Sequence, residues 1–287
     1  MTKPPAPAAV DRSRAHSFNA VAASYAANRP SYPAALLDAV EELSGRPLAG
    51  ARVVDVGAGT GIATRLLRER GARVLAVEPG EGMAAELRRG LPEVPVVRGD
   101  GDALPLAGAG ADLITYAQSW HWTQPERSVP EALRVLRPGG ALAAWWNVSD
   151  AGVPWIAAQD ARLRERFGPQ GGALGKHASP PGKEQAPEPN PMPGPGGGSV
   201  SPRYGSGRDR SLAYWPETRH REVRWSRRIP VDTHLANLAS HSIMLIQDEE
   251  TATAFLTAER AALLAEFPDG QVKETYVTEL SVAIRPA

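Results

Sequence analysis

Short apolar runs alternate with helical spacings through the first half of this chain. Four of residues 51–56 are Val or Ala, with no turn former among them. This composition is typical of a short strand buried on both faces of a parallel sheet. Glycines at 57, 59 and 61 follow, and then Ile62, Leu66 and Leu67 recur at helical spacing. Strand, glycine turn and helix in this order predict the opening unit of a nucleotide-binding α/β domain.

The same alternation continues along the chain and ends in a mixed C-terminal part. Ser31 is placed to cap a second N-terminal helix, with Pro33 in its first turn. We expect strands at 73–77, 94–97, 111–116, 141–146, 222–231 and 276–284, and helices at 18–25, 125–136, 154–167, 233–246 and 252–266. The pattern predicts an α/β fold, a Rossmann-like doubly wound sheet with helices on both faces.

Two segments do not carry this pattern. Residues 1–14 are rich in Pro and Ala, and residues 168–211 contain almost only Pro, Gly, Ser and charged residues. Such segments bury too little apolar surface to order themselves. We therefore expect a disordered tail at 1–14, a disordered insertion at 168–211, and one domain formed by 15–167 and 212–287, with its ligand-binding core at 45–147.

Composition narrows the class of protein. The 287 residues are 42% hydrophobic, and 32 basic residues balance 32 acidic ones, so no net charge favours nucleic acid or anionic lipid. The chain has no cysteine, which excludes disulfides, thiolate zinc sites and a cysteine nucleophile. No apolar run is long enough to span a membrane, and the first residues lack a signal-peptide core. We expect a cytoplasmic protein.

The spacing of the glycines indicates the ligand. A dinucleotide fingerprint would place glycine at 62, where Ile62 stands. Asp55, two residues before the first glycine, would repel a pyrophosphate but suits an ammonium group. S-adenosylmethionine (SAM) has that group and no phosphate. At this point the sequence resembles the class I SAM-dependent methyltransferases, which implies a seven-stranded sheet with an antiparallel last strand and a helical N-terminal cap.

Acidic residues after later strands extend this resemblance. Glu78 follows the strand at 73–77 and suits the ribose hydroxyls, although it could instead cap the helix beginning near Gly80. Asp100-Gly101-Asp102 resembles the family motif Gly-Asp-Ala-Glu-x-Leu-Pro, which implies that Asp100 and the Gly101 amide bind adenine. Met83 either flanks the adenine or belongs to the core. A calcium loop would need further ligands, so we expect no metal.

Two motifs point to a subgroup. Residues 25–33, Tyr-x-x-x-Arg-Pro-x-Tyr-Pro, and the Gln-x-x-His-Trp motif at 118–122 resemble type 11 methyltransferases similar to trans-aconitate methyltransferase. The resemblance implies that Tyr25 and Arg29 contact the methionine part of SAM, Arg29 facing its carboxylate; a core aromatic and a solvated arginine are the alternative. The full set of expected cofactor contacts is Tyr25, Arg29, Asp55, Gly57, Ala58, Gly59, Gly61, Glu78, Pro79, Met83, Asp100, Gly101, Asp102, Ala117 and Gln118.

The segment after the strand at 111–116 carries the candidate catalytic residue. Ligands of open parallel sheets lie beyond the carboxyl ends of the strands, where Trp120, His121 and Trp122 follow. The two indoles are candidates to wall the sulfonium and the substrate, and His121 is the candidate base for a hydroxyl or amine acceptor, with His241 behind it. Alternatively, His121 orders the loop and both indoles are core.

The sequence thus predicts a SAM-dependent methyltransferase that methylates a small molecule on a carboxylate or hydroxyl and releases S-adenosylhomocysteine. A carboxylate acceptor would need no base. Two alternatives stay open: a methyltransferase acting on RNA or protein, and a SAM-binding member of the fold without transfer activity. We expect no nucleic-acid or membrane partner, and a monomer or homodimer.

Overall fold

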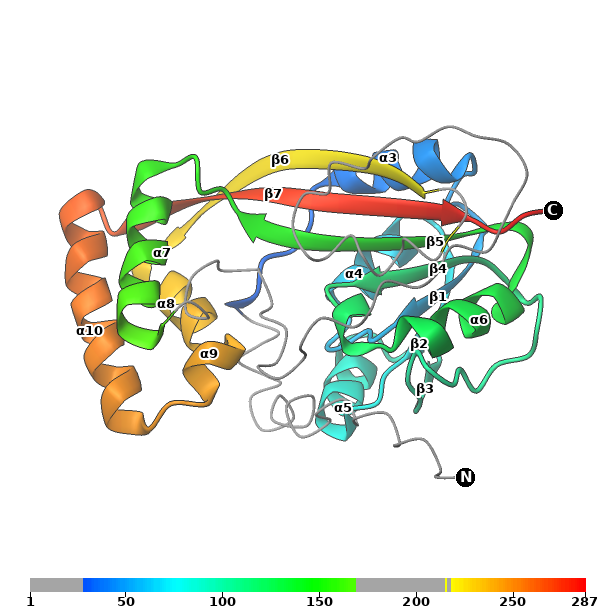
Figure 1. Cartoon of the computed structure of the whole chain (residues 1–287), viewed down its shortest axis with the longest axis horizontal. Helices are drawn as coiled ribbons and strands as arrows, with labels where there is room; N and C mark the ends of the chain where they lie inside the picture. Colours follow the sequence, from blue (N-terminus) through cyan, green and yellow to red (C-terminus); the bar gives the residue numbers. More distant parts are fainter. Residues whose placement is uncertain (1–27, 169–214, 216–217) are drawn as a thin grey trace, which may run out of the picture.

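The computed structural model describes residues 28–168, 215 and 218–287 (Figure 1). The expected helix at 18–25, the tail at 1–14 and the insertion at 168–211, except Gly168, lie outside the described residues. None of the helices in the described ranges combines the length and the apolar character needed to cross a bilayer.

A seven-stranded mixed sheet organises the described part of the chain, in the order β3-β2-β1-β4-β5-β7-β6. Five strands are parallel, and β7 runs antiparallel to both of its neighbours. Their bounds are β1 Arg52–Val56, β2 Arg73–Val77, β3 Val96–Val97, β4 Ala111–Ala117, β5 Leu136–Ser149, β6 Thr218–Pro230 and β7 Gln271–Ile284. The expected α/β fold with an antiparallel last strand is confirmed.

Alternate residues of the central strands pack against helices on opposite faces. Val53 and Leu113 belong to one core cluster with α3 (Ala34–Ser44) and α4 (Ile62–Glu69). Val54 and Ile114 belong to another cluster with α6 (Pro125–Val135). The side chains of a strand alternate between faces, so both faces of the parallel sheet are apolar and covered, as the Val-rich runs predict. The helix α5 (Glu81–Gly90) packs beside β2 through Leu87.

A helical lobe lies at the far ends of the three long strands (Figure 1). It contains α7 (Pro154–Phe167), α8 (Val231–Ala239), α9 (Ser242–Leu245) and α10 (Glu249–Glu266). Leu163, Leu238 and Phe255 form its apolar centre. A second cluster, including Val231 and Leu263, joins the lobe to Val272 of β7. The long strands β5, β6 and β7 thus connect the lobe to the rest of the sheet.

Several boundaries differ from the sequence expectation. Pro33 occupies the N-cap position of α3 with no side-chain cap, and the Ser31 carbonyl instead accepts a hydrogen bond from Asn147 Nδ2 at 3.1 Å. The helix expected at 233–246 is broken, because the backbone of His241 is extended between α8 and α9, with φ −76° and ψ 146°. β5 begins at Leu136, the last residue of the expected helix 125–136, and so includes residues 137–140 that were expected to be a connection.

Candidate functional site

The glycine bend after β1 needs its glycines for different reasons. Gly57, Gly59 and Gly61 have φ values of +66°, +58° and +89°, which residues with a side chain rarely adopt. A Cβ on Gly57 would lie 2.5 Å from the Cβ of Ser119, whereas a Cβ on Gly59 would meet nothing within 4 Å. Gly57 therefore allows close packing against the segment after β4, and Gly59 exposes backbone to open space.

Glu78, at the end of β2, is bonded to this bend. Its Oε2 accepts from the Gly59 amide at 2.8 Å and its Oε1 from the Gly80 amide at 2.7 Å. Burial raises the pKa of Glu78, and the two amide bonds oppose that rise. Glu78 thus holds the glycine bend and binds the amide at the start of α5, as the capping interpretation expects, and its contact with the ribose stays a prediction. The expected neighbours Ala58 and Met83 are buried, and Pro79 accepts from Arg98 through its carbonyl.

Asp55 lies beneath the bend. It is fully buried, and its two carboxylate oxygens accept from Thr64 Oγ1 at 2.6 Å and Thr115 Oγ1 at 2.8 Å. Burial raises its pKa to about 6, against the opposing effect of the two hydroxyls. The Asp55 carboxylate thus joins β1, α4 and β4 from inside the fold, and its contact with the ligand ammonium stays a prediction.

The loop after β3 places two aspartates in different roles. Asp100 Oδ1 accepts from the amides of Asp102 and Ala103 at 3.0 and 3.1 Å, which shapes the loop beyond the strand. Asp102 is buried, and its Oδ1 accepts from the Gln124 amide at 2.8 Å, at the start of α6. Gly101 is needed for packing, because a Cβ there would lie 3.0 Å from the Tyr116 hydroxyl. Of the expected adenine contacts, Asp100 is the partly exposed carboxylate at the site edge.

The end of β4 contains an unusual backbone conformation. After Ala117, Gln118 has a φ of +58° although it is not glycine, and its amide donates to the Trp145 carbonyl at 2.9 Å. Such a conformation costs free energy and is found most often at functional sites. Gln118 also lines a pocket that continues toward the helical lobe.

The segment 120–122 is a 3-10 helix, η2, in which the three aromatic residues face different surroundings. Trp120 is 1% exposed and packs edge-on against Tyr116, with ring centroids 4.6 Å apart. This burial corrects the expectation that Trp120 walls the substrate. His121 and Trp122 are partly exposed, with ring centroids 4.8 Å apart, and His121 Nδ1 lies 3.3 Å from Trp146 Nε1.

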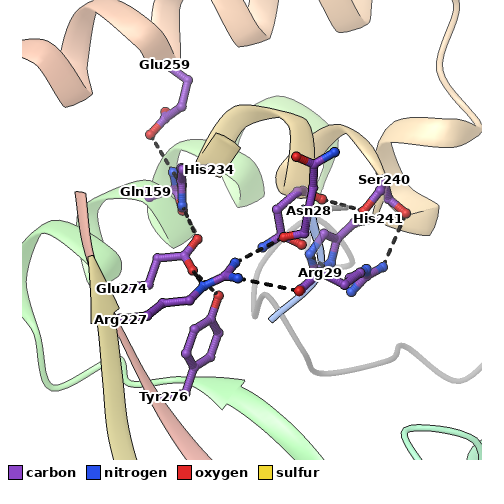
Figure 2. Close-up of polar contacts among 11 residues, drawn as sticks. Asn28, Arg29, Gln159, Arg227, His234, Ser240, His241, Glu259, Glu274 and Tyr276 are labelled. Atoms are coloured by element: carbon purple, nitrogen blue, oxygen red, sulfur yellow. Dashed lines mark hydrogen bonds and ion pairs between the residues drawn. The ribbon is translucent and has the colours of Figure 1, made fainter. Parts of the chain in front are cut away.

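Arg29 contacts the helical lobe. Its Nη2 donates to the Ser240 carbonyl at 3.2 Å, and its Nη1 lies 3.5 Å from His241 Nε2 (Figure 2). Arg29 and His241 both line the pocket that Gln118 borders. The structure therefore brings these two sequence candidates together, whereas Tyr25 lies outside the described residues.

A buried polar network forms the outer wall of this pocket (Figure 2), and sequence reasoning missed it. Glu274 Oε1 accepts from His234 Nδ1 at 2.6 Å, and Glu274 Oε2 is bonded to Arg227 Nε at 2.5 Å and the Tyr276 hydroxyl at 2.8 Å. Gln159 continues the network from His234 to Glu259. These residues come from α7, β6, α8, β7 and α10, and no local spacing in the sequence links them.

Comparison with known protein families gives a match in the part of the chain that contains the glycine bend. Residues 54–144 match the family model described as a methyltransferase domain. An uncharacterized methyltransferase of Mycobacterium tuberculosis is 41% identical over 140 residues, which are 49% of this chain and 56% of that protein. A malonyl-[acyl-carrier protein] O-methyltransferase of Methylococcus capsulatus is 39% identical over 136 residues, 44% of this chain and 48% of that protein. The chain spans about half the length of the curated relatives it matches.

The whole fold also has a solved counterpart. A structure described as a type II methyltransferase from Anaeromyxobacter dehalogenans superimposes with a TM-score of 0.61 at 23% identity, covering 90% of this chain and 98% of that one. At this identity the likeness shows the fold alone. The family model thus places residues 54–144 within a methyltransferase domain.

Proposed function

We propose that the protein transfers a methyl group from SAM to a small molecule, by O-methylation of a carboxylate or hydroxyl, and releases S-adenosylhomocysteine. The observation that carries this proposal is the hydrogen bond of 2.8 Å between the Gly59 amide and Glu78. It fixes a glycine bend and a carboxylate beside each other at the carboxyl ends of two adjacent parallel strands, where ligands of open α/β sheets bind.

The residues of the bend fit SAM. The space above Gly59 is open, and the buried Oγ1 of Thr60 makes no hydrogen bond with the described residues. A buried hydroxyl without a partner favours a polar ligand at this position. Glu78 is the residue we assign to the ribose hydroxyls, because each carboxylate oxygen can accept a bond beyond the one it has. Asp100 and the Gly101 amide are assigned to the adenine.

The methionine end is assigned to Gln118, Arg29 and Tyr25. Gln118 and Arg29 line one pocket, and the arginine supplies positive charge for a carboxylate. SAM supplies an activated methyl group when bound, so the protein has mainly to orient the acceptor and exclude water. His121 and Trp122 remain our candidates for the acceptor side.

The larger organisation of the chain is part of the proposal. Residues 15–167 and 212–287 would form one methyltransferase domain, with 168–211 as an insertion between α7 and β6. The lobe supports this arrangement, because Gln159 and Arg162 of α7 bind Glu259 of α10 across the insertion. The motifs at 25–33 and 118–122 favour the type 11 subgroup similar to trans-aconitate methyltransferase.

Calorimetry with SAM and S-adenosylhomocysteine tests the cofactor assignment. We expect binding of both molecules and none of NADH, because the bend lacks the third glycine of a dinucleotide fingerprint. A methyl-release assay on carboxylates, phenols and amines then separates an enzyme from a SAM-binding protein. Binding of NADH in place of SAM would overturn the proposal.

A further inference from the structure

The pocket beyond Gln118 is lined at its outer wall by three polar side chains of α7 and α8, Gln159, His234 and Asn237. All three are at least nine-tenths buried, with exposures of 0%, 4% and 5%. Trp155, Tyr276 and Leu238 supply apolar surface around them. In a pocket that binds a small molecule, polar groups held in fixed positions determine which molecules bind.

The orientation of the Gln159 amide is determined by its neighbours. Its nitrogen lies 2.8 Å from Glu259 Oε1, and a carboxylate can only accept there. The same nitrogen lies 2.9 Å from His234 Nε2, which accepts because His234 Nδ1 donates to Glu274. The amide oxygen must therefore point away from this network.

That oxygen has no partner in the part of the chain that the structure describes. Gln159 Oε1 is buried and makes no hydrogen bond with the described residues. Asn237 Oδ1, on the same wall, is also buried and makes none. Leaving a buried acceptor unsatisfied costs free energy, so each oxygen favours a ligand group that donates a hydrogen bond.

The arginines behind this wall are already paired with carboxylates. Glu259 and Glu274 are 1% and 2% exposed and lie at the two ends of the Gln159–His234 chain. Arg162 and Arg227 bind these carboxylates, and Arg227 also donates to the carbonyls of Asn28 and Arg29. Arg29, which lines the pocket, is seen well apart from Gln159 (Figure 2). A carboxylate placed at Gln159 would meet an amide oxygen and no cation of its own.

We infer that the acceptor carries a hydroxyl or amino group that donates a hydrogen bond to Oε1 of Gln159, and that Gln159 determines which acceptors bind. The identification of this ligand as the methyl acceptor rests on the proposed function. The preference of the pocket for a group that donates a hydrogen bond does not depend on it. It narrows the proposed substrate class: a carboxylate, if the molecule has one, lies elsewhere than at this wall.

The test uses the whole chain saturated with S-adenosylhomocysteine and a set of small fragments in matched series. Each scaffold is present as an alcohol, an amine, a carboxylate and a methyl ether, and dissociation constants are measured by ligand-observed NMR. The methyl ether keeps the oxygen of the alcohol but cannot donate. We expect alcohols or amines to bind about tenfold more tightly than the matched ethers and carboxylates, as one buried hydrogen bond predicts.

Two variants complete the experiment. Gln159→Met keeps the length of the side chain but removes its oxygen, and it should abolish the tenfold preference while leaving the affinity for SAM unchanged. Gln247→Met is the matched control, because Gln247 bonds only the Ile243 carbonyl of its own helix region and does not line the pocket. If Gln159→Met fails to fold, the alcohol-to-ether ratio of the natural chain decides by itself.

Every outcome separates this inference from the proposed function. Preference for carboxylates, equal binding of alcohols and ethers, failure of every alcohol and amine to bind, or an unchanged preference in Gln159→Met would overturn the inference. Absence of SAM binding together with a preference for alcohols would instead contradict the proposed methyl transfer, while supporting the inferred role of Gln159.

Discussion

The Nε1 atom of Trp146 lies 3.3 Å from Nδ1 of His121 and donates to it. Because an indole nitrogen can only donate, Nδ1 is the unprotonated nitrogen and the neutral ring carries its proton on Nε2. In this state Nε2 of His121 offers a donor rather than a second lone pair. The bond therefore favours a role in orienting the acceptor over a role as base, and it also provides the loop-ordering contact that the sequence left open.

Replacing His121 with Ala should lower turnover by about 100-fold, within the range of a positioned side chain that holds a proton in the site. SAM affinity, measured by calorimetry, should change little, because the substitution does not alter the glycine bend or Glu78. His220→Ala is the control, since His220 bonds Ser281 within the β6–β7 pair. Equal turnover in His121→Ala would remove His121 from the reaction.

Substituting Gly57 with Ala should destabilise the fold by roughly 3 kcal/mol, as measured by urea unfolding. The backbone at residue 57 is left-handed, which alanine rarely adopts, and the added methyl group would lie 2.5 Å from Ser119 Cβ. Gly139→Ala is the matched control, because Gly139 has a φ of +67° but nothing within 4 Å of its added Cβ. It should cost only the conformational part, about 1 kcal/mol. Similar losses of unfolding free energy in the two variants would contradict this prediction, because they would show that Ser119 moves away from the new methyl group at little cost.

The Asp55 carboxyl should make stability depend on pH between about 4 and 6. Its pKa is raised from the ordinary 3.8 to about 6, so the folded state binds this proton more tightly than the unfolded state. The resulting stabilisation is fully present below pH 3.8 and is lost as the pH rises through 6. Relative to Asp55→Asn, the natural chain should lose about 3 kcal/mol across this window. The same dependence of the free energy of unfolding on pH in the two proteins would contradict this prediction.

Replacing Glu78 with Gln should weaken SAM binding at least tenfold and lower stability by about 2 kcal/mol. The carboxylate accepts from Gly59 and Gly80 with separate oxygens, and an amide nitrogen would face one of these N–H groups. Glu81→Gln is the control, because the Glu81 side chain is 87% exposed on the next turn. Calorimetry and thermal unfolding of both variants provide the measurement, and unchanged SAM affinity in Glu78→Gln would remove it from the cofactor site.

The cofactor half was predictable because its signals are local. The strand at 73–77 and the helix at 154–167 match β2 and α7, since short apolar runs and helical spacing report directly on burial. The roles of Asp55 and Trp120 were not predictable in the same way. A residue at a strand end points either into the core or toward the ligand, and only the packing of Thr64, Thr115 and Tyr116 decides which.

The outer pocket was not predictable at all. Gln159 and Glu259 stand 100 positions apart and meet because α7 and α10 pack in one lobe. His234 lies in an expected helix and Glu274 just before an expected strand, with nothing nearby to mark either as a partner. Long-range contacts of this kind depend on tertiary geometry, which periodicity does not describe.

The matched segment 54–144 includes Gln118 but ends before Asn147, Gln159, His234 and Glu274, which form the pocket's outer wall. Under the proposed function, the residues assigned to the adenosine part of SAM lie inside the matched segment, whereas the residues inferred to select the acceptor lie in α7 and α8, after it. Substitutions confined to these two helices would then change which acceptor binds without altering the glycine bend or Glu78.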